Sequence, residues 1–229
     1  YLSFLMNDCR KVYKKEDSKG ISEYDIFYPD GTRRAHMKLN DDGNKDGLVT
    51  VYYRNGQKSV EANYKDGITH GLYTAWYSTG KKMNETEYTD GVRNGYLTAW
   101  YANGHVQHEG WYKGDVKQGL WRYYYQNGNL KNEIYYLNDN TDGWYKEYNV
   151  NGSLTDIYYF DQNLNVSRTC FDTAGKRTDS VRYTDKPAHV KHSHWQQTGL
   201  PVQSEYDTKY FDVDGKTVTR YINGKICEE

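Results

Sequence analysis

Short runs rich in Tyr, Trp, Val and Thr recur along the chain, and glycines separate them at fixed intervals. Residues 70–80 read HGLYTAWYSTG, and residues 94–104 read NGYLTAWYANG. Glycines at one position of this pattern recur every 23 to 25 residues: Gly31, Gly56, Gly80, Gly104, Gly128, Gly152, Gly175 and Gly199. Two further glycine columns keep the same phase: Gly47, Gly71, Gly95, Gly119 and Gly143, and Gly43, Gly67, Gly91 and Gly114. Phased columns of this period are the signature of a repeat array.

Each unit contains two β-rich runs around a turn dipeptide. A run such as LYTAWY leads to the turn, and a run such as QKSVEANY follows one. Asn-Gly between such runs favours a two-residue primed turn, because both residues tolerate a positive φ. The dipeptides are Asn55-Gly56, Asn103-Gly104, Asn127-Gly128 and Asn151-Gly152. The sequence therefore predicts an all-β fold, an elongated single-layer antiparallel meander of stacked β-hairpin repeats with a period of 24 residues.

The regularity of the repeats divides the chain into three parts. Residues 27–175 hold the regular hairpin repeats, and residues 1–26 form an N-terminal segment, either an export-signal remnant or a capping strand. Residues 176–229 hold divergent repeats and a C-terminal cap, since Gly215 follows Gly199 by only 16 positions and terminal repeats are often atypical.

Aromatic residues form columns at fixed positions of the unit. The column four residues before the turn glycine contains Phe27, Tyr52, Trp76, Trp100, Tyr124 and Tyr148, and the next position contains Tyr53, Tyr77, Tyr101 and Tyr125. Cross-strand aromatic pairs stabilise sheets, so most of these rings are expected to be structural. A one-layer sheet leaves some of them exposed, and Trp and Tyr are enriched in binding hot spots. The candidate partner-binding residues are Trp76, Trp100, Tyr124, Tyr148, Tyr77, Tyr101 and Tyr125.

Composition and charge narrow the function classes. Hydrophobic residues make up only 36% of the chain, and 26 tyrosines supply most of its aromatic residues, which is typical of a thin structure with much surface. Thirty basic against 31 acidic residues, interleaved along the chain, disfavour a nucleic-acid partner. Three cysteines, Cys9, Cys170 and Cys227, have neither disulfide-framework nor zinc-site spacing.

A column of carboxylates, Glu61, Glu85, Glu109 and Glu133, also follows the 24-residue step. In a two-residue-turn register these residues face Thr50, Thr74, Thr98 and Arg122, whereas a three-residue turn would change the pairing. Neighbours in the column would lie about 10 Å apart on an open sheet. We interpret the column as a structural or solvated ladder and expect no enzymatic activity, metal or cofactor.

Two weaker candidates lie near the ends of the chain. His189, His192 and His194 are the only clustered imidazoles and form a weak candidate metal site; a solvated loop is the competing interpretation. The apolar run before Cys9 is too short to span a membrane. Asp8 precedes Cys9 and makes a poor lipobox, so the compartment stays open between the bacterial cytoplasm and the cell envelope, where Cys9 would anchor a lipoprotein.

The unit GLYTAWYSTGKKMNETEYTDGVRNG at residues 71–95 resembles the MORN-repeat variant of bacterial YwqK-family toxin-antitoxin antitoxins. The resemblance covers residues 27–175 and weakens after Gly152, where Ile157 replaces the expected Glu. It implies an elongated sheet of hairpins that makes protein contacts.

Two functions are compatible with these features. The first is a non-enzymatic repeat scaffold for protein–protein interaction, with an antitoxin-like role in view of the resemblance. The alternative is a cell-surface module that binds carbohydrate or cell wall through its aromatic columns. Wall-binding repeats carry few charges, whereas each central unit here contains a Glu and several Lys or Asp residues, which favours the scaffold.

Overall fold

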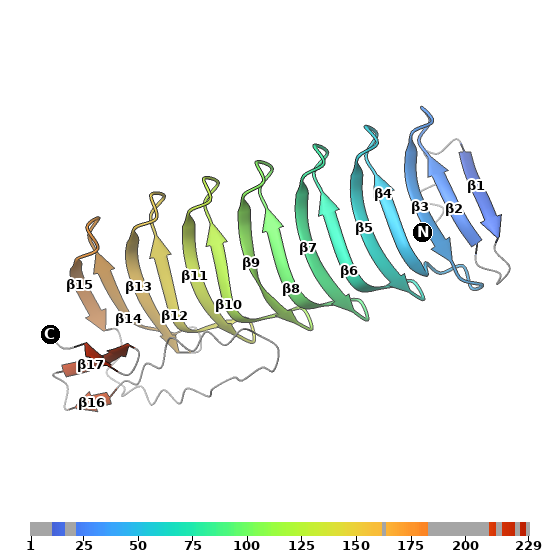
Figure 1. The fold of residues 1–229 in the computed structure, drawn as a ribbon. Helices are drawn as coiled ribbons and strands as arrows, with labels where there is room; N and C mark the ends of the chain where they lie inside the picture. Colours follow the sequence, from blue (N-terminus) through green and yellow to red (C-terminus); the bar gives the residue numbers. More distant parts are fainter. Residues whose placement is uncertain are drawn as a thin grey trace.

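A computed structural model describes residues 11–16, 22–161, 164–182, 211–213, 217–222 and 225–227, and gives side chains for residues 22–161 and 167–178. Fifteen strands form one antiparallel sheet in which every strand pairs with its neighbours in sequence (Figure 1). No helix occurs in the described part of the chain. The predicted all-β hairpin meander is therefore confirmed.

The strands of this sheet are short and similar in length. They are β1 (Lys11–Glu16), β2 (Ser22–Phe27), β3 (Arg33–Leu39), β4 (Gly47–Tyr52), β5 (Lys58–Lys65), β6 (Ile68–Trp76), β7 (Lys82–Thr89), β8 (Val92–Trp100), β9 (Val106–Lys113), β10 (Val116–Tyr124), β11 (Leu130–Leu137), β12 (Asn140–Tyr148), β13 (Leu154–Asp161), β14 (Leu164–Phe171) and β15 (Arg177–Arg182). Three further strands, β16 (Phe211–Val213), β17 (Thr217–Ile222) and β18 (Lys225–Cys227), pair with one another.

The hairpin tips at the upper edge of Figure 1 differ from the predicted turn. Tyr53 N–H donates to the carbonyl of Gln57 at 2.8 Å, and Gly56 N–H donates to the carbonyl of Tyr53 at 2.9 Å. Gly56 has a φ of 82°, whereas Asn55 is not among the residues with positive φ. The tip is thus a three-residue loop, a type I turn followed by a left-handed glycine. The two-residue primed turn predicted at Asn-Gly is wrong, because only the glycine adopts the left-handed conformation.

The predicted pairing across each hairpin is nevertheless confirmed. Tyr52 pairs with Lys58, but Val51 pairs with Val60, so one residue of β5 is bulged out of register. This bulge compensates for the longer loop and restores the register of a two-residue turn. The expected pairs are all present: Thr50 with Glu61, Thr74 with Glu85, Thr98 with Glu109 and Arg122 with Glu133.

Primed turns occur at the opposite edge of the sheet, where two-residue turns connect one hairpin to the next; two of them are Asp-Gly, at Asp66-Gly67 and Asp90-Gly91. Asp66 and Gly67 have φ values of 49° and 82°, as expected for both positions of a type I′ turn. Gly67 N–H also donates to the carbonyl of Lys45 in the preceding unit at 2.8 Å. Backbone hydrogen bonds therefore connect successive turns along this edge.

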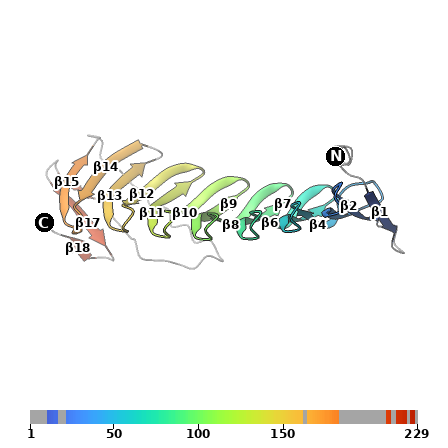
Figure 2. The same ribbon diagram turned by 90° about the horizontal axis from the view of Figure 1, so that it is seen from above.

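A glycine bulge bends the strand that leaves each of these turns. In β6 the register with β5 shifts by two residues between Ala62 and Tyr64, and Gly71 lies in the bulge with a φ of 95°. Bulges increase local twist and bend a strand. Seen from above, the hairpins are curved and follow one another in a single row (Figure 2).

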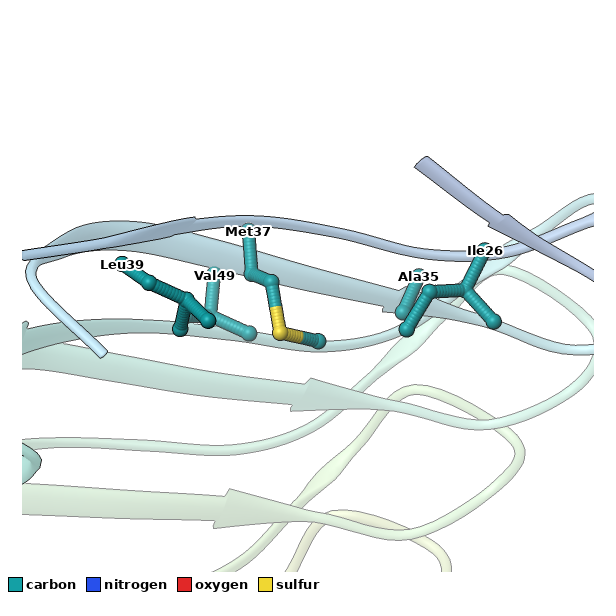
Figure 3. Close-up of a cluster of buried hydrophobic side chains, with 5 residues drawn as sticks. All are labelled: Ile26, Ala35, Met37, Leu39 and Val49. Atoms are coloured by element: carbon teal, nitrogen blue, oxygen red, sulfur yellow. The ribbon is translucent and has the colours of Figure 1, made fainter. Parts of the chain in front are cut away.

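The two faces of the sheet are packed differently. We call face A the side that carries two clusters of buried apolar side chains. One cluster, shown in Figure 3, lies on β2, β3 and β4 and contains Ile26, Ala35, Met37, Leu39 and Val49. A second contains Leu97, Ala99, Tyr112 and Trp121. Face B is the opposite side, and it carries the Thr–Glu pairs. Face B is the more open face over β4 to β10, whereas at β13 it carries the buried Ile157 and Tyr159.

Candidate functional site

Face B carries a column of exposed apolar side chains at one position of four consecutive repeats. Between 37% and 46% of each of these residues is exposed to solvent: Leu48, Leu72, Tyr96 and Leu120. They lie on β4, β6, β8 and β10, each directly after a glycine of the 47/71/95/119 column. Two strands separate neighbours, so their spacing is about 10 Å. We call these four residues the exposed column.

The neighbouring strands change the character of this surface along the sheet. Across the hairpins, Leu48 pairs with Asn63 and Leu72 pairs with Glu87. Tyr96 pairs with Trp111, and their ring centroids lie 6.3 Å apart. Leu120 faces the exposed Tyr135. The surface beside the exposed column therefore becomes more aromatic from β8 onward.

The exposed column is not among the residues predicted from the sequence, which are all members of the two aromatic columns. Three of its four members are leucines, and their surroundings decide whether they are exposed. A signal was nevertheless present, since an apolar residue follows each glycine of the column, with Trp144 after Gly143 as the fifth case.

The predicted residues Trp76, Trp100, Tyr124 and Tyr148 are half-buried and lie near the tips. The Lys58 ammonium lies 5.5 Å from the ring centroid of Trp76, and that of Lys82 lies 5.7 Å from Trp100. Tyr124 donates a hydrogen bond to Glu109 at 2.6 Å, and Tyr148 donates one to Glu133 at 3.0 Å. Charged groups thus fix the orientation of these rings, which keep part of their surface accessible.

The other predicted residues, Tyr77, Tyr101 and Tyr125, connect one repeat to the next. Their hydroxyls donate hydrogen bonds to the backbone carbonyls of Trp100, Tyr124 and Tyr148 at 2.8, 2.8 and 2.9 Å. A buried tyrosine usually finds such a partner for its hydroxyl. These three tyrosines therefore hold the tips of adjacent repeats at a fixed separation.

The carboxylate column is held by neighbouring side chains. Glu61 accepts hydrogen bonds from Lys58 and Thr50, and Glu85 accepts them from Lys82 and Thr74. Glu133 lies 3.2 Å from Arg122 Nε and 3.7 Å from Lys146 Nζ. These contacts are those of a structural ladder.

Glu109 is contacted by two tyrosine hydroxyls, those of Tyr96 and Tyr124, whereas one tyrosine, Tyr148, contacts Glu133. Partial burial and the charge of Glu109 raise the pKa of Tyr96 to about 12. Burial, next the hydrogen bond to Glu109 and then the charge of Glu109 raise the pKa of Tyr124. Both phenols therefore stay protonated at neutral pH and serve as hydrogen-bond donors on face B.

An aromatic cluster on face A surrounds the Lys117 ammonium. This group lies 4.7 Å from the ring centroid of Trp121 and 4.8 Å from that of Tyr136, and it donates a hydrogen bond to the Tyr123 hydroxyl at 3.0 Å. His108 stacks on Trp121 at 6.2 Å. Burial, and next the charge of Lys117, lower the pKa of His108. The cluster packs β9, β10 and β11 together.

The two remaining candidates from the sequence lie outside the described residues. These are the histidines at 189, 192 and 194 and the cysteine at 9. Within the part of the chain that the structure describes, no three His, Cys, Asp or Glu residues are grouped in a way that could hold a metal ion. In the same part, none of the elements is a helix with the length and apolar character needed to cross a membrane.

Comparison with solved structures gives only weak similarities. The crystal structure of TarM is 16% identical, with a TM-score of 0.22, and the match covers 58% of this chain and 20% of TarM. A point mutant of S. aureus TarM in complex with fondaparinux, α-GlcNAc-glycerol and UDP is 15% identical, with a TM-score of 0.24 and coverages of 62% and 22%. This chain therefore spans about a fifth of the length of these structures, and such scores do not inform its function. No curated protein matches the chain.

Comparison with family models identifies the repeat itself. The model described as the MORN repeat variant matches residues 45–66, 69–90 and 117–138. Each match begins within two residues of the start of β4, β6 or β10 and ends at the next Asp-containing turn, in phase with the 24-residue period. Three repeats of the chain therefore match the MORN repeat variant.

Proposed function

We propose that the chain is a non-enzymatic repeat scaffold that binds another protein through face B. The observation that carries this proposal is the exposed column, which places apolar side chains on the open face of four consecutive repeats. From β8 onward, where Tyr96 pairs with Trp111 and Leu120 faces Tyr135, this apolar surface is contiguous, and contiguous exposed apolar surface marks interaction sites. MORN repeats generally form non-catalytic modules that bind proteins or membranes, which is compatible with this function.

The surroundings of the exposed column suit a protein partner. Half-buried Trp76 and Trp100 lie on the same face, nearer the tips, and Trp is the residue most enriched in interface hot spots. The tyrosine contacts between repeats fix the tips before a partner arrives, and preorganisation of this kind lowers the cost of binding. An antitoxin role is one form of this function, in which the partner would be a toxin protein.

Capture of partners by face-B variants tests the proposal. The immobilised chain would be exposed to extract of its own host, and bound proteins identified by mass spectrometry. Leu72→Asp and Trp100→Ala should each lose the bound protein. Val150→Asp changes a residue of a tip loop that is 52% exposed, and this control should retain it. If all three variants capture the same proteins as the parent chain, face B is not the contact surface.

A carbohydrate-binding module is the second candidate, because rings gather on face B from β8 onward. Tyr96 and Trp111 form a pair, and Tyr135 is exposed nearby. Stacking of sugar rings on such side chains would give binding on a glycan array or to peptidoglycan. A signal of this kind that Trp100→Ala abolishes would favour this candidate over the scaffold.

A further inference from the structure

We propose that the partner binds face B with an amphipathic α-helix that runs across the strands, along the exposed column. This inference rests on the proposed function and specifies the partner. The helix would present one apolar residue in every seven to the sheet, with basic residues beside this apolar stripe. Each apolar residue would contact one member of the exposed column.

The spacing of the exposed column matches the period of a helix. Successive members are two strands apart, which corresponds to about 9.6 Å. Seven residues of an α-helix advance by about 10.5 Å and return to nearly the same side of the helix. From Leu48 to Leu120 six strand spacings amount to about 29 Å, whereas 21 helical residues amount to about 31 Å. The mismatch is about 1 Å for each repeat, which flexible Leu side chains can absorb.

Other peptide conformations fit the column less well. An extended strand presents side chains to one face every 6.7 or 13 Å, and neither distance matches the repeat. A polyproline II helix returns to the same side after about 9.3 Å and therefore matches in length. Such helices, however, dock into grooves lined by aromatic side chains. Three of the four members of the exposed column are leucines, which suit the aliphatic side chains of an amphipathic helix.

The apolar surface is also wide enough for more than a narrow contact. Ile68 and Val92 are exposed at the turns that precede Leu72 and Tyr96. They extend the apolar surface from the column toward the edge of the sheet. A helix has a diameter of about 10 Å with its side chains, so residues beside its apolar stripe would lie over Ile68 and Val92.

Charge supplies an independent argument for the chemistry of the partner. The exposed column lies between the Glu61/85/109/133 column and the turn aspartates Asp66, Asp90, Asp115 and Asp139. Lys58, Lys82, Arg122 and Lys146 contact three of the glutamates, and His70 and Arg93 contact Asp90 and Asp115. Arg122 is also the cross-strand partner of Glu109, and within the described residues no ion pair is formed by Glu87, Asp66 or Asp139.

The exposed cations at the same turns are fewer. Lys65 and Lys113 are exposed at the ends of β5 and β9, so the carboxylates without an ion pair outnumber them. Lys or Arg residues beside the apolar stripe of the helix would therefore find acidic partners. The carboxylates of face B would repel a helix whose apolar stripe is flanked by Asp or Glu residues.

Synthetic helical peptides test this inference with the full chain. The probe is a fluorescein-labelled peptide of about 28 residues, four heptads, built from Ala, Gln and Lys, with Leu at every seventh position. A control peptide has the same composition with its Leu residues distributed around the helix, and a second control replaces Lys by Glu. A polyproline II peptide with Leu at every third position tests the competing conformation. Binding is measured by fluorescence anisotropy, and helix formation by circular dichroism.

We expect the heptad peptide to bind at least tenfold more tightly than both helical controls and to gain helicity on binding. Leu72→Asp and Leu120→Asp should each weaken this binding at least tenfold, whereas Val150→Asp should leave it unchanged. Melting temperatures of the variants would exclude unfolding as the cause, and Leu72→Ala would replace any variant that fails to fold.

The inference is overturned if the heptad and redistributed peptides bind equally or not at all, or if the polyproline II peptide binds more tightly. These results leave the proposed function intact where Leu72→Asp still abolishes capture of the host protein. If neither the peptide nor the captured protein responds to Leu72→Asp, the helix and the face-B scaffold both fail.

Discussion

Replacement of Gly110 by Ala tests the packing of face A at its tightest point. Gly110 lies on β9 under the indole of Trp121, which is only 1% exposed. A Cβ atom at Gly110 would lie 2.2 Å from Cδ2 of Trp121 and 2.4 Å from Cε2. The indole would have to move, and its edge contact with Tyr112, now 4.9 Å between centroids, would be lost.

The expected sign of the change is what makes Gly110→Ala informative. Gly110 does not have a positive φ, so in open space Ala would stabilise the strand by about 0.5–1 kcal/mol. Overpacking in a filled core costs about 1–3 kcal/mol, and a lost aromatic pair costs about 0.5–1.5 kcal/mol more. We therefore expect a net loss of about 1–3 kcal/mol in the free energy of unfolding.

The preceding repeat supplies a matched control. Leu97 and Thr86 occupy the positions that Trp121 and Gly110 occupy one repeat later. The double variant Trp121→Leu with Gly110→Thr imports this pair and should recover most of the stability lost by Gly110→Ala. Urea unfolding followed by tryptophan fluorescence and amide hydrogen exchange in β9 and β10 would measure both changes. A Gly110→Ala variant as stable as the parent chain, or more stable, would show that the indole does not lie on Gly110.

Three further predictions concern single contacts. The pKa of His108 is lowered in the folded chain, which therefore favours the neutral imidazole. The contribution of this preference to the free energy of unfolding is complete above the unfolded-state pKa near 6.5 and is lost as the pH falls toward the folded-state pKa. Melting temperatures between about pH 7.5 and 5 should therefore fall more for the parent chain than for His108→Gln, and equal slopes would contradict this. Tyr101→Phe removes the hydrogen bond to the carbonyl of Tyr124 and should cost about 1 kcal/mol, with faster amide exchange confined to the adjoining tips; uniform protection would argue against that role. Gly104→Val forces a β-branched residue to a φ of 98° and should cost about 1–3 kcal/mol in thermal unfolding, whereas an unchanged melting temperature would remove the left-handed glycine from the tip.

The period and the cross-hairpin pairs could be predicted from the sequence, but the turn type could not. Asn-Gly is compatible with a primed turn and with a type I turn followed by a left-handed glycine. Asn103 favours the second arrangement because its side chain accepts a hydrogen bond from His105 N–H at 3.0 Å and donates one to the carbonyl of Gln126 at 2.7 Å. The second bond reaches the next repeat, and a single repeat gives no sign of it. The bulge in the following strand restores the pairing of a two-residue turn, so the pairing across the hairpin does not reveal the turn type.

The exposed face could not be assigned from the sequence for a related reason. Alternation along a strand places Leu72 and Tyr73 on opposite faces, and both residue types are compatible with a core. The residues on the adjacent strands decide between them. Tyr73 contacts Tyr88 at 5.7 Å between ring centroids and pairs with the buried Ala62 of the preceding repeat. Leu72, by contrast, pairs with the exposed Glu87. Exposure is thus a property of the contacts between strands, which the alternation within one strand does not contain.

The separation of the two faces has a consequence for how this array combines stability with binding. Repeats contact one another through face A, through the tip tyrosines and through the backbone bonds between turns. None of these contacts uses the exposed side chains of Leu48, Leu72 or Leu120. Because a repeat array gains stability from nearest-neighbour contacts, changes in the exposed column should alter binding at nearly constant stability. Changes at Trp121 should do the reverse and act mainly on stability, so a column variant that unfolds the array would place the leucines in the core.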